Sequence, residues 1–328
     1  MKKITTLLIF AMLLTFNLSA QNDKESFKPS GKAFVRIFSN FHSTISEGTT
    51  SSAFELDRAY LGYDFNLSEN FSGKINFDIG NPGVGKLEMT AYIKNAYLSY
   101  SKNDFSVMFG MIPTTQFNFQ ENIWGYRYIA KVFQDEYKMG SSADLGLSAS
   151  YKFTSWLSAD AIIVNGEGYK ALQADNNFRS GIGITLKPMK KLNIRGYFDI
   201  MGSDSAQTTF ASFISYDFGK ATIGAEYNLQ QNAGYNEGKD YSGTSVYASF
   251  IPTKKIKLFG RYDYLTSATL EGQSSNWNRK KDGSLIFAGI EYQPVKGVKI
   301  APNYRLWNPA DSEQKPTQYI YLSCEIKF

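Results

Sequence analysis

The sequence predicts an all-β protein, a transmembrane antiparallel β-barrel of about 16 strands. Three observations predict this fold. The chain begins with an export signal, it continues as a series of strand-length segments in which apolar and polar residues alternate, and the connections between these segments alternate between short and long. In a membrane barrel the apolar faces meet lipid and the polar faces line the lumen.

The first twenty residues are typical of a secretory signal peptide. Lys2 and Lys3 precede an apolar run over 7–14, and Leu18-Ser19-Ala20 offers small residues for cleavage. The apolar run is shorter than the roughly 20 residues that a membrane-spanning helix needs, which disfavours the alternative of an uncleaved anchor. We expect a signal peptide over 1–20, a periplasmic segment over 21–31 and the barrel over 32–328.

Composition favours antiparallel β structure and excludes several functions. Aromatic residues make up 16% of the chain and glycines number 27, which suits strands joined by tight turns. The net charge of +5 is scattered and forms no basic stripe, so we expect no nucleic-acid partner. With one His and one Cys, Cys324, the chain lacks a His cluster for a metal, and we expect no metal or other cofactor.

Sixteen segments have the length and the alternation of tilted membrane strands, which need about 9–11 residues. The last segment shows the pattern most clearly, because every second residue from Ile320 to Phe328 is apolar and most residues between them are polar. The predicted strands are 32–42, 55–66, 71–80, 90–101, 103–111, 141–151, 156–166, 176–187, 191–202, 206–218, 220–230, 241–251, 256–266, 283–293, 297–306 and 317–328.

The connections separate a membrane barrel from a soluble β-sandwich. Every second link is short, as at 101–103, 218–220, 252–255 and 294–296, and most of the others are long, as at 43–54, 112–140, 231–240, 267–282 and 307–316. Short periplasmic turns and long external loops are typical of outer-membrane barrels. An even strand number then places both termini in the periplasm. No motif repeats at the spacing of propeller blades, which disfavours a β-propeller.

Charged residues fall on the inward parity of the predicted strands. A charge on the lipid face would cost about 2–4 kcal/mol at mid-depth, so these side chains belong in a wet or internally paired interior. Lys94 is a misfit on the apolar parity, which indicates either a bulge or a position near the rim. The pore-lining candidates on strands are Arg36, Arg58, Lys74, Asp78, Asp144, Arg179, Arg195, Asp199, Arg261 and Arg305.

Barrel size predicts an open lumen, because barrels of about 16 strands leave an aqueous channel and 14 would narrow it. The aromatic-rich segment 112–140 is long for a structureless loop. Folded inward it would narrow the lumen, with Glu121, Arg127 and Lys131 in the constriction; the alternative is an external loop with a short helix. Because inward acids and bases are about balanced, we expect a mixed field rather than a strongly anionic or cationic lining.

The stretch from Phe54 to about Phe153, a third of the chain, resembles the porin O/P family of phosphate-selective porin-like barrels. The motifs that carry the resemblance are Phe54-Glu55-Leu56-Asp57-Arg58-Ala59-Tyr60-Leu61-Gly62-Tyr63, Ile93-Lys94-Asn95-Ala96-Tyr97, Val107-Met108-Phe109-Gly110-Met111, Trp124-Gly125-Tyr126-Arg127-Tyr128 and Ala143-Asp144-Leu145-Gly146-Leu147. The resemblance implies a 16-stranded porin, often a homotrimer, with an inward-folded loop. Asp57 stands where a second basic residue is expected, so phosphate selectivity is not carried over.

Three functional hypotheses follow. The first is passive diffusion of small hydrophilic solutes or ions across the outer membrane of a Gram-negative bacterium, with the membrane lipid as the other partner. The second is a non-transporting barrel, either structural or a subunit of an envelope assembly. The third, a barrel enzyme, would have to use His42, and the sequence offers it no identifiable orienting partner; we therefore expect a protein that is not an enzyme.

Overall fold

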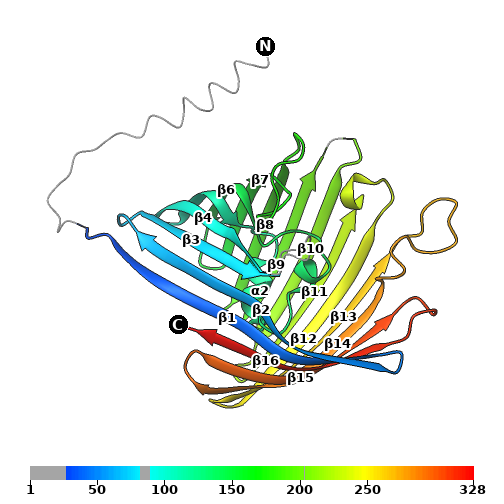
Figure 1. Cartoon of the computed structure of the whole chain (residues 1–328). Helices are drawn as coiled ribbons and strands as arrows, with labels where there is room; N and C mark the ends of the chain where they lie inside the picture. The colour runs from blue at the N-terminus through cyan, green and yellow to red at the C-terminus, as the bar shows by residue number, and fades with distance from the viewer. Residues whose placement is uncertain (1–26, 82–88, 203) are drawn as a thin grey trace.

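A closed antiparallel barrel forms the protein (Figure 1). The computed structural model describes residues 27–81, 89–202 and 204–328, so the predicted signal peptide and most of segment 21–31 lie outside the described residues. Each strand pairs with its neighbours in sequence, and β1 closes the barrel against β16, with Arg36 opposite Lys327 and Ile45 opposite Gln318.

All sixteen predicted strands are confirmed, most within two or three residues at each end. The strands are β1 Ser30–Ser46, β2 Thr49–Asn66, β3 Phe71–Gly80, β4 Thr90–Lys102, β5 Phe105–Pro113, β6 Ala143–Lys152, β7 Leu157–Val164, β8 Arg179–Met189, β9 Leu192–Met201, β10 Gln207–Asp217, β11 Ala221–Gln231, β12 Tyr241–Thr253, β13 Ile256–Ser267, β14 Gly283–Val295, β15 Val298–Pro309 and β16 Thr317–Lys327. The helices are α2 Asn118–Trp124, α3 Phe133–Glu136 and the 3₁₀ turn η1 Ala233–Tyr235.

The two ends of the barrel differ as the connection lengths predict. We call the end near Phe328 the turn end, because tight reversals join strands there, as at Asn103, whose φ of 54° is left-handed. The opposite end, the loop end, carries most of the long connections, which rise at the upper right of Figure 1.

One connection differs from the prediction. The stretch 43–54 is not a long loop, because β1 and β2 continue as a paired hairpin around a two-residue turn. Glu47 and Gly48 have φ values of 52° and 78°, which suit the type I′ turn that matches strand twist. Its Ser- and Thr-rich strands are held by pairs such as Ser43 and Ser52, whose hydroxyls lie 2.6 Å apart. This hairpin lacks apolar alternation, and therefore the sequence pattern did not indicate strands.

A β-bulge resolves the misfit at Lys94. Asn76 pairs with Asn95 and Phe77 pairs with Ile93, so Lys94 is an extra residue on β4. Its Nζ lies 5.1 Å from the ring centroid of the inward-facing Tyr60. The bulge therefore turns Lys94 into the lumen while Ile93 and Leu98 stay on the outer face.

The outer face of the barrel is apolar around its whole circumference. Exposed aliphatic side chains alternate with inward polar ones on strands far apart in the chain, as at Leu61, Leu147, Ile184, Val246 and Ile320. Monomeric soluble proteins rarely expose contiguous apolar patches above about 300–600 Å². Within the described residues, no helix has the length and apolar character to cross a membrane.

Candidate functional site

The segment 114–142, between β5 and β6, lies inside the barrel, where α2 is seen in Figure 1. Its two ends meet, because the amide of Thr114 donates to the carbonyl of Ser142 at 3.2 Å. Within the segment the indole of Trp124 donates to the carbonyl of Ala130 at 2.9 Å, and Gly125 ends α2 in the left-handed conformation that glycine favours. We call this stretch the inward segment.

Aromatic packing fills the space between the inward segment and one side of the wall. Trp124 is 1% exposed, and its ring centroid lies 5.0 Å from that of Tyr247 on β12 and 6.2 Å from that of Phe287 on β14. The ring of Tyr126 packs against that of Phe259 on β13 in a tilted arrangement, with centroids 4.7 Å apart. Burial of large apolar side chains stabilises by about 1.5–3 kcal/mol each, so this aromatic cluster holds the segment in place.

Arginines of the wall bind main-chain carbonyls of the inward segment. Arg195 on β9 donates to the carbonyl of Thr115 at 2.7 Å, and Arg305 on β15 donates to that of Ile129 at 2.8 Å. Arg261 on β13 donates to the carbonyl of Lys131 at 2.5 Å. A buried carbonyl without a partner is costly, and the guanidinium, with five donors, can satisfy it and an acid together.

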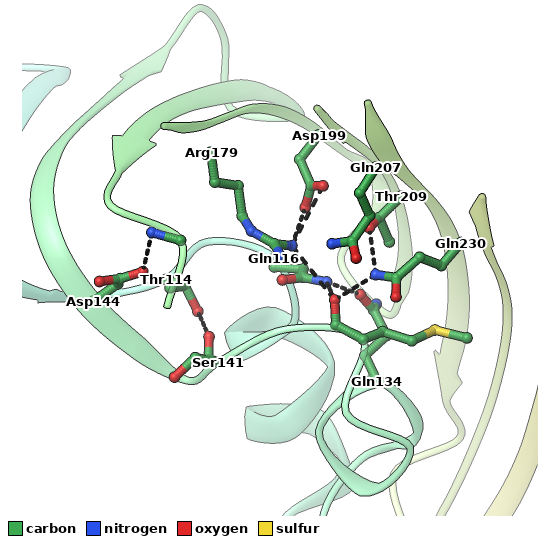
Figure 2. Close-up of polar contacts among 12 residues, drawn as sticks. Thr114, Gln116, Gln134, Ser141, Asp144, Arg179, Asp199, Gln207, Thr209 and Gln230 are labelled. Carbon is green, nitrogen blue, oxygen red and sulfur yellow. Dashed lines mark hydrogen bonds and ion pairs between the residues drawn. The ribbon is translucent and has the colours of Figure 1, made fainter. Parts of the chain in front are cut away.

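The carbonyl of Met139 accepts hydrogen bonds from three further donors. Gln230 on β11, Gln116 of the segment and Arg179 on β8 donate to it at 2.8, 3.2 and 3.4 Å. Figure 2 shows this network, with Arg179 also paired to Asp199, whose Oδ2 lies 3.2 Å from its Nη1. Four of the predicted pore-lining arginines therefore direct donors to the inward segment, and Asp199 neutralises one of them.

Paired charges accompany this anchoring. Arg261 also binds Asp263 through two hydrogen bonds of 2.8 and 2.6 Å, and both side chains are fully buried. Arg195 binds Asp160 in the same bidentate way, at 2.7 and 3.0 Å. On β14, Glu291 accepts a hydrogen bond from the hydroxyl of Tyr128 at 2.9 Å.

On the opposite side of the lumen the inward segment presents a charged cluster. Arg127 is 7% exposed and lies 3.1 Å from Glu121 and 3.3 Å from Asp135, and Lys131 lies 3.6 Å from Asp135. Burial acts to lower the pKa of Arg127, but attraction to Tyr60, Asp135 and Glu121 outweighs it and raises the pKa, so the guanidinium stays charged. Burial acts to raise the pKa of Asp135, but Arg127 and Lys131 lower it overall.

The loop between β7 and β8 also makes contacts on this side of the lumen. Tyr169, from the loop between β7 and β8, donates its hydroxyl to Asp78, which also pairs with Arg58 at 2.6 Å. Asp144 holds this loop, because its carboxylate accepts hydrogen bonds from the backbone amides of Gly166 and Gly168 at 2.7 and 3.1 Å (Figure 2 labels Asp144). Asp144 therefore acts on the loop rather than facing open space.

Several cavities lie in the lumen beside the inward segment, and two of them follow β1 and β2. The loop-side cavity, of about 190 Å³, is lined by residues including Asn40, Asp57, Arg58, Arg127 and Tyr321. The turn-side cavity, of about 300 Å³, is lined by residues including Arg36, Lys74, Lys94, Asn95 and Arg127. Arg127 borders both cavities and is the residue that their two linings share.

The remaining predicted residues lie toward the turn end. Arg36 pairs with Glu325 on β16 at 2.5 Å, and Glu325 also binds Lys299 at 3.0 Å. Lys74 pairs with Asp64 at 3.1 Å and lies over the ring of Phe34. The structure thus brings together Arg58, Asp78 and Arg127 near the middle of the lumen, while Arg36 and Lys74 line its turn-end vestibule.

Sequence reasoning did not single out several residues of this site. Tyr169 and Asp135 lie in connections, where no alternation marks the direction of a side chain, and Lys94 was flagged only as a misfit. An acid four residues after Lys131 was the available signal for the pair with Asp135. His42 lies on the hairpin, where its Nδ1 is 2.9 Å from the amide oxygen of Asn40 and 3.7 Å from Glu55.

Solved structures of outer-membrane channels share this fold. The chain matches the channel DcaP of Acinetobacter baumannii with a TM-score of 0.66 at 12% identity, covering 92% of this chain and 97% of that one. It matches OprB of Pseudomonas putida with a TM-score of 0.71 at 7% identity, covering 91% and 94%. An anion-selective porin from Comamonas acidovorans gives 0.64 at 12% identity, covering 92% and 100%. No protein-family model matches the sequence, and no curated protein does. At these identities the likeness shows the fold alone.

Proposed function

We propose that this protein is an outer-membrane channel through which small hydrophilic solutes and ions diffuse passively, narrowed by the inward segment. The observation that carries the proposal is the pair of polar cavities that both border Arg127 inside a closed barrel with an apolar outer face. A barrel of about 16 strands is wide enough for an aqueous passage.

The outer face supports a place in a membrane. Aromatic pairs stand near the turn end of neighbouring hairpins, such as Phe71 with Tyr100, and Tyr216 with Phe218, whose ring centroids lie 5.0 and 4.6 Å apart. Aromatic girdles that border an apolar band are typical of outer-membrane barrels, where the rings lie at the lipid headgroups. The predicted signal peptide adds the export step, and the strand number favours periplasmic termini.

The passage lies on the side of the lumen formed by β1 to β4, β15 and β16. The aromatic packing around Trp124 and three of the four arginine contacts occupy the side formed by β8 to β14, whereas the two cavities are lined mainly by the other strands. Solute selection then depends on the lining around Arg127, which includes Arg58 in the loop-side cavity and Tyr60 in the turn-side cavity.

A non-transporting barrel is the second candidate, and the dense packing around Trp124 favours it. Purified protein in planar bilayers separates the two. The channel proposal expects stable ion conductance from the complete protein, and a larger conductance when residues 115–140 are replaced by a short glycine linker. The linker has little distance to span, because Thr114 and Ser142 are hydrogen-bonded. Conductance that begins only after this replacement would support the closed barrel and overturn the channel proposal.

The planar-bilayer measurement also tests how many copies of the chain assemble. The resemblance to porins implies a homotrimer, and a trimeric channel gives conductance steps in groups of three, whereas a monomer gives single steps. Chemical cross-linking in detergent before reconstitution provides an independent count of subunits.

A further inference from the structure

A third cavity, which we call the hydroxyl cavity, lies between the inward segment and strands β5 to β9. Its volume is about 340 Å³, at the lower end of the range for small-molecule sites, roughly 300–1,000 Å³. It shares Pro113, Asn118 and Asn122 with the turn-side cavity, so it opens from the same vestibule.

More than half of the residues that line this cavity carry a hydroxyl or an amide group. Serines from β5, β6 and β7 and threonines from β8 and the inward segment surround it, together with Asn118 and Asn122. A hydroxyl both donates and accepts hydrogen bonds, and an amide offers two donors and an acceptor. Such a lining complements a solute that also carries donors and acceptors on adjacent atoms.

Two of these hydroxyls are buried without a partner among the described residues. Ser148 on β6 is 3% exposed, and its Oγ makes no hydrogen bond there. The Oγ1 of Thr115 is also buried and unpartnered. Buried polar atoms are nearly always satisfied, by protein, water or ligand, so these two groups need a partner that the described protein atoms do not supply.

Of the three charged side chains that line this cavity, one acid and one base pair with each other. Asp160 and Arg195 form a bidentate pair, and Arg195 is further occupied by Thr185 at 2.9 Å. Lys187 lies at the exposed rim, with its Nζ 5.6 Å from the ring centroid of Phe119. Phe119 adds an aromatic surface to the lining, which suits the C–H face of a ring-shaped solute.

We propose that the hydroxyl cavity is a binding subsite for a neutral polyhydroxylated solute, the size of a mono- or disaccharide, beside the diffusion path. The proposal rests on the channel function proposed above and names a class of solute for it. We expect a neutral solute because Asp160 and Arg195 neutralise each other and Lys187 lies at the exposed rim. The preference for several hydroxyls follows from the unpartnered groups of Ser148 and Thr115 together with the amides of Asn118 and Asn122.

Sucrose is the probe, and single-channel current in a planar bilayer is the measurement. We expect sucrose to reduce the ion current saturably. A polyethylene glycol of the same hydrodynamic radius, which has ether oxygens but lacks adjacent hydroxyls, should reduce it only in proportion to its concentration. Equal, non-saturating effects of the two solutes would overturn the proposal while leaving the channel function intact. The absence of any current would instead overturn the channel function.

Substitutions in the hydroxyl cavity test whether sucrose binds there. The double variant Ser148→Ala and Thr115→Val should raise the half-saturating sucrose concentration about fivefold or more, as expected when neutral hydrogen bonds are lost. Ser245→Ala is the matched control, because Ser245 on β12 is also buried with an unpartnered hydroxyl but does not line this cavity. Unchanged affinity in the double variant, or an equal loss in the control, would contradict the location. The comparison of sucrose with polyethylene glycol on the unmodified protein decides the proposal even if the double variant fails to fold.

Discussion

The two sides of the lumen use charge in different ways. On the side of β8 to β14, arginines are buried, paired with acids and bonded to carbonyls of the inward segment, as Arg261 shows with Asp263 and Lys131. On the side of β1 to β4, basic groups such as Lys94 and Arg127 border cavities. Basic side chains therefore anchor the inward segment on one side and belong to the proposed passage lining on the other. The position of the inward segment decides which of the two roles a basic side chain has.

Replacing an arginine that anchors the inward segment should have the largest effect on stability and on the current. Arg261→Met leaves Asp263 buried without its partner and frees the carbonyl of Lys131, and removal of one member of a buried pair costs about 3–5 kcal/mol. We expect a lower urea midpoint for unfolding in detergent and a noisier, larger single-channel current. The double variant with Asp263→Leu should recover much of the stability, and no change in either measurement would contradict the anchoring role.

A milder change on the same side is Tyr128→Phe. It removes the hydrogen bond to Glu291, which is worth about 1.5–3 kcal/mol when the acceptor is charged, and keeps the ring in the aromatic cluster. Current noise should rise while ion selectivity stays constant. Tyr262→Phe is a suitable control because its side chain lies on the outer face. An equal rise in current noise in this control would show that the hydrogen bond to Glu291 is not the cause.

On the passage side, Arg127→Gln should change selectivity. One unit charge at about 4 Å in a water-like medium corresponds to about 1 kcal/mol, or roughly fivefold in the ratio of anion to cation permeability. Reversal potentials in a chloride gradient measure this ratio, and Arg127→Lys, which keeps the charge, should retain it. If Arg127→Gln left the reversal potential unchanged, the passage would lie elsewhere in the lumen.

Acidification should have the smallest effect on conductance, because the change is expected only well below neutral pH. Because the folded pKa of Asp135 is lowered below its ordinary value of 3.8, its stabilising contribution is present above that value and is lost as the pH falls through the lowered pKa. Conductance should be constant from pH 8 to pH 5 and become noisy only below about pH 4. Asp135→Asn should show the noisy behaviour already at neutral pH, and identical acid profiles for the two proteins would exclude this carboxylate as the cause.

Alternation of side chains carried most of the fold prediction. Strands such as β16 and β13 were located because one face must be apolar and the next residue must point the other way, which is a local property of an extended chain. The hairpin of residues 43–54 was missed because its residues are polar on both faces. Lys94 violated the alternation, and the bulge that explains it is a property of pairing with β3, which the sequence of β4 does not contain.

The sequence by itself determined the barrel, its strand number and the inward parity of its charged residues, because these depend on period-two alternation and on connection length. Only the tertiary structure decided what each inward charge does. Arg58, Arg195 and Arg261 each lie on the inward face of their own strand. The groups that they bind come from residues 20 to 130 positions away in the sequence. The path of the inward segment assigns these roles, because its carbonyls need donors wherever they meet the wall, and that path depends on the packing of Trp124 and Tyr126 against distant strands.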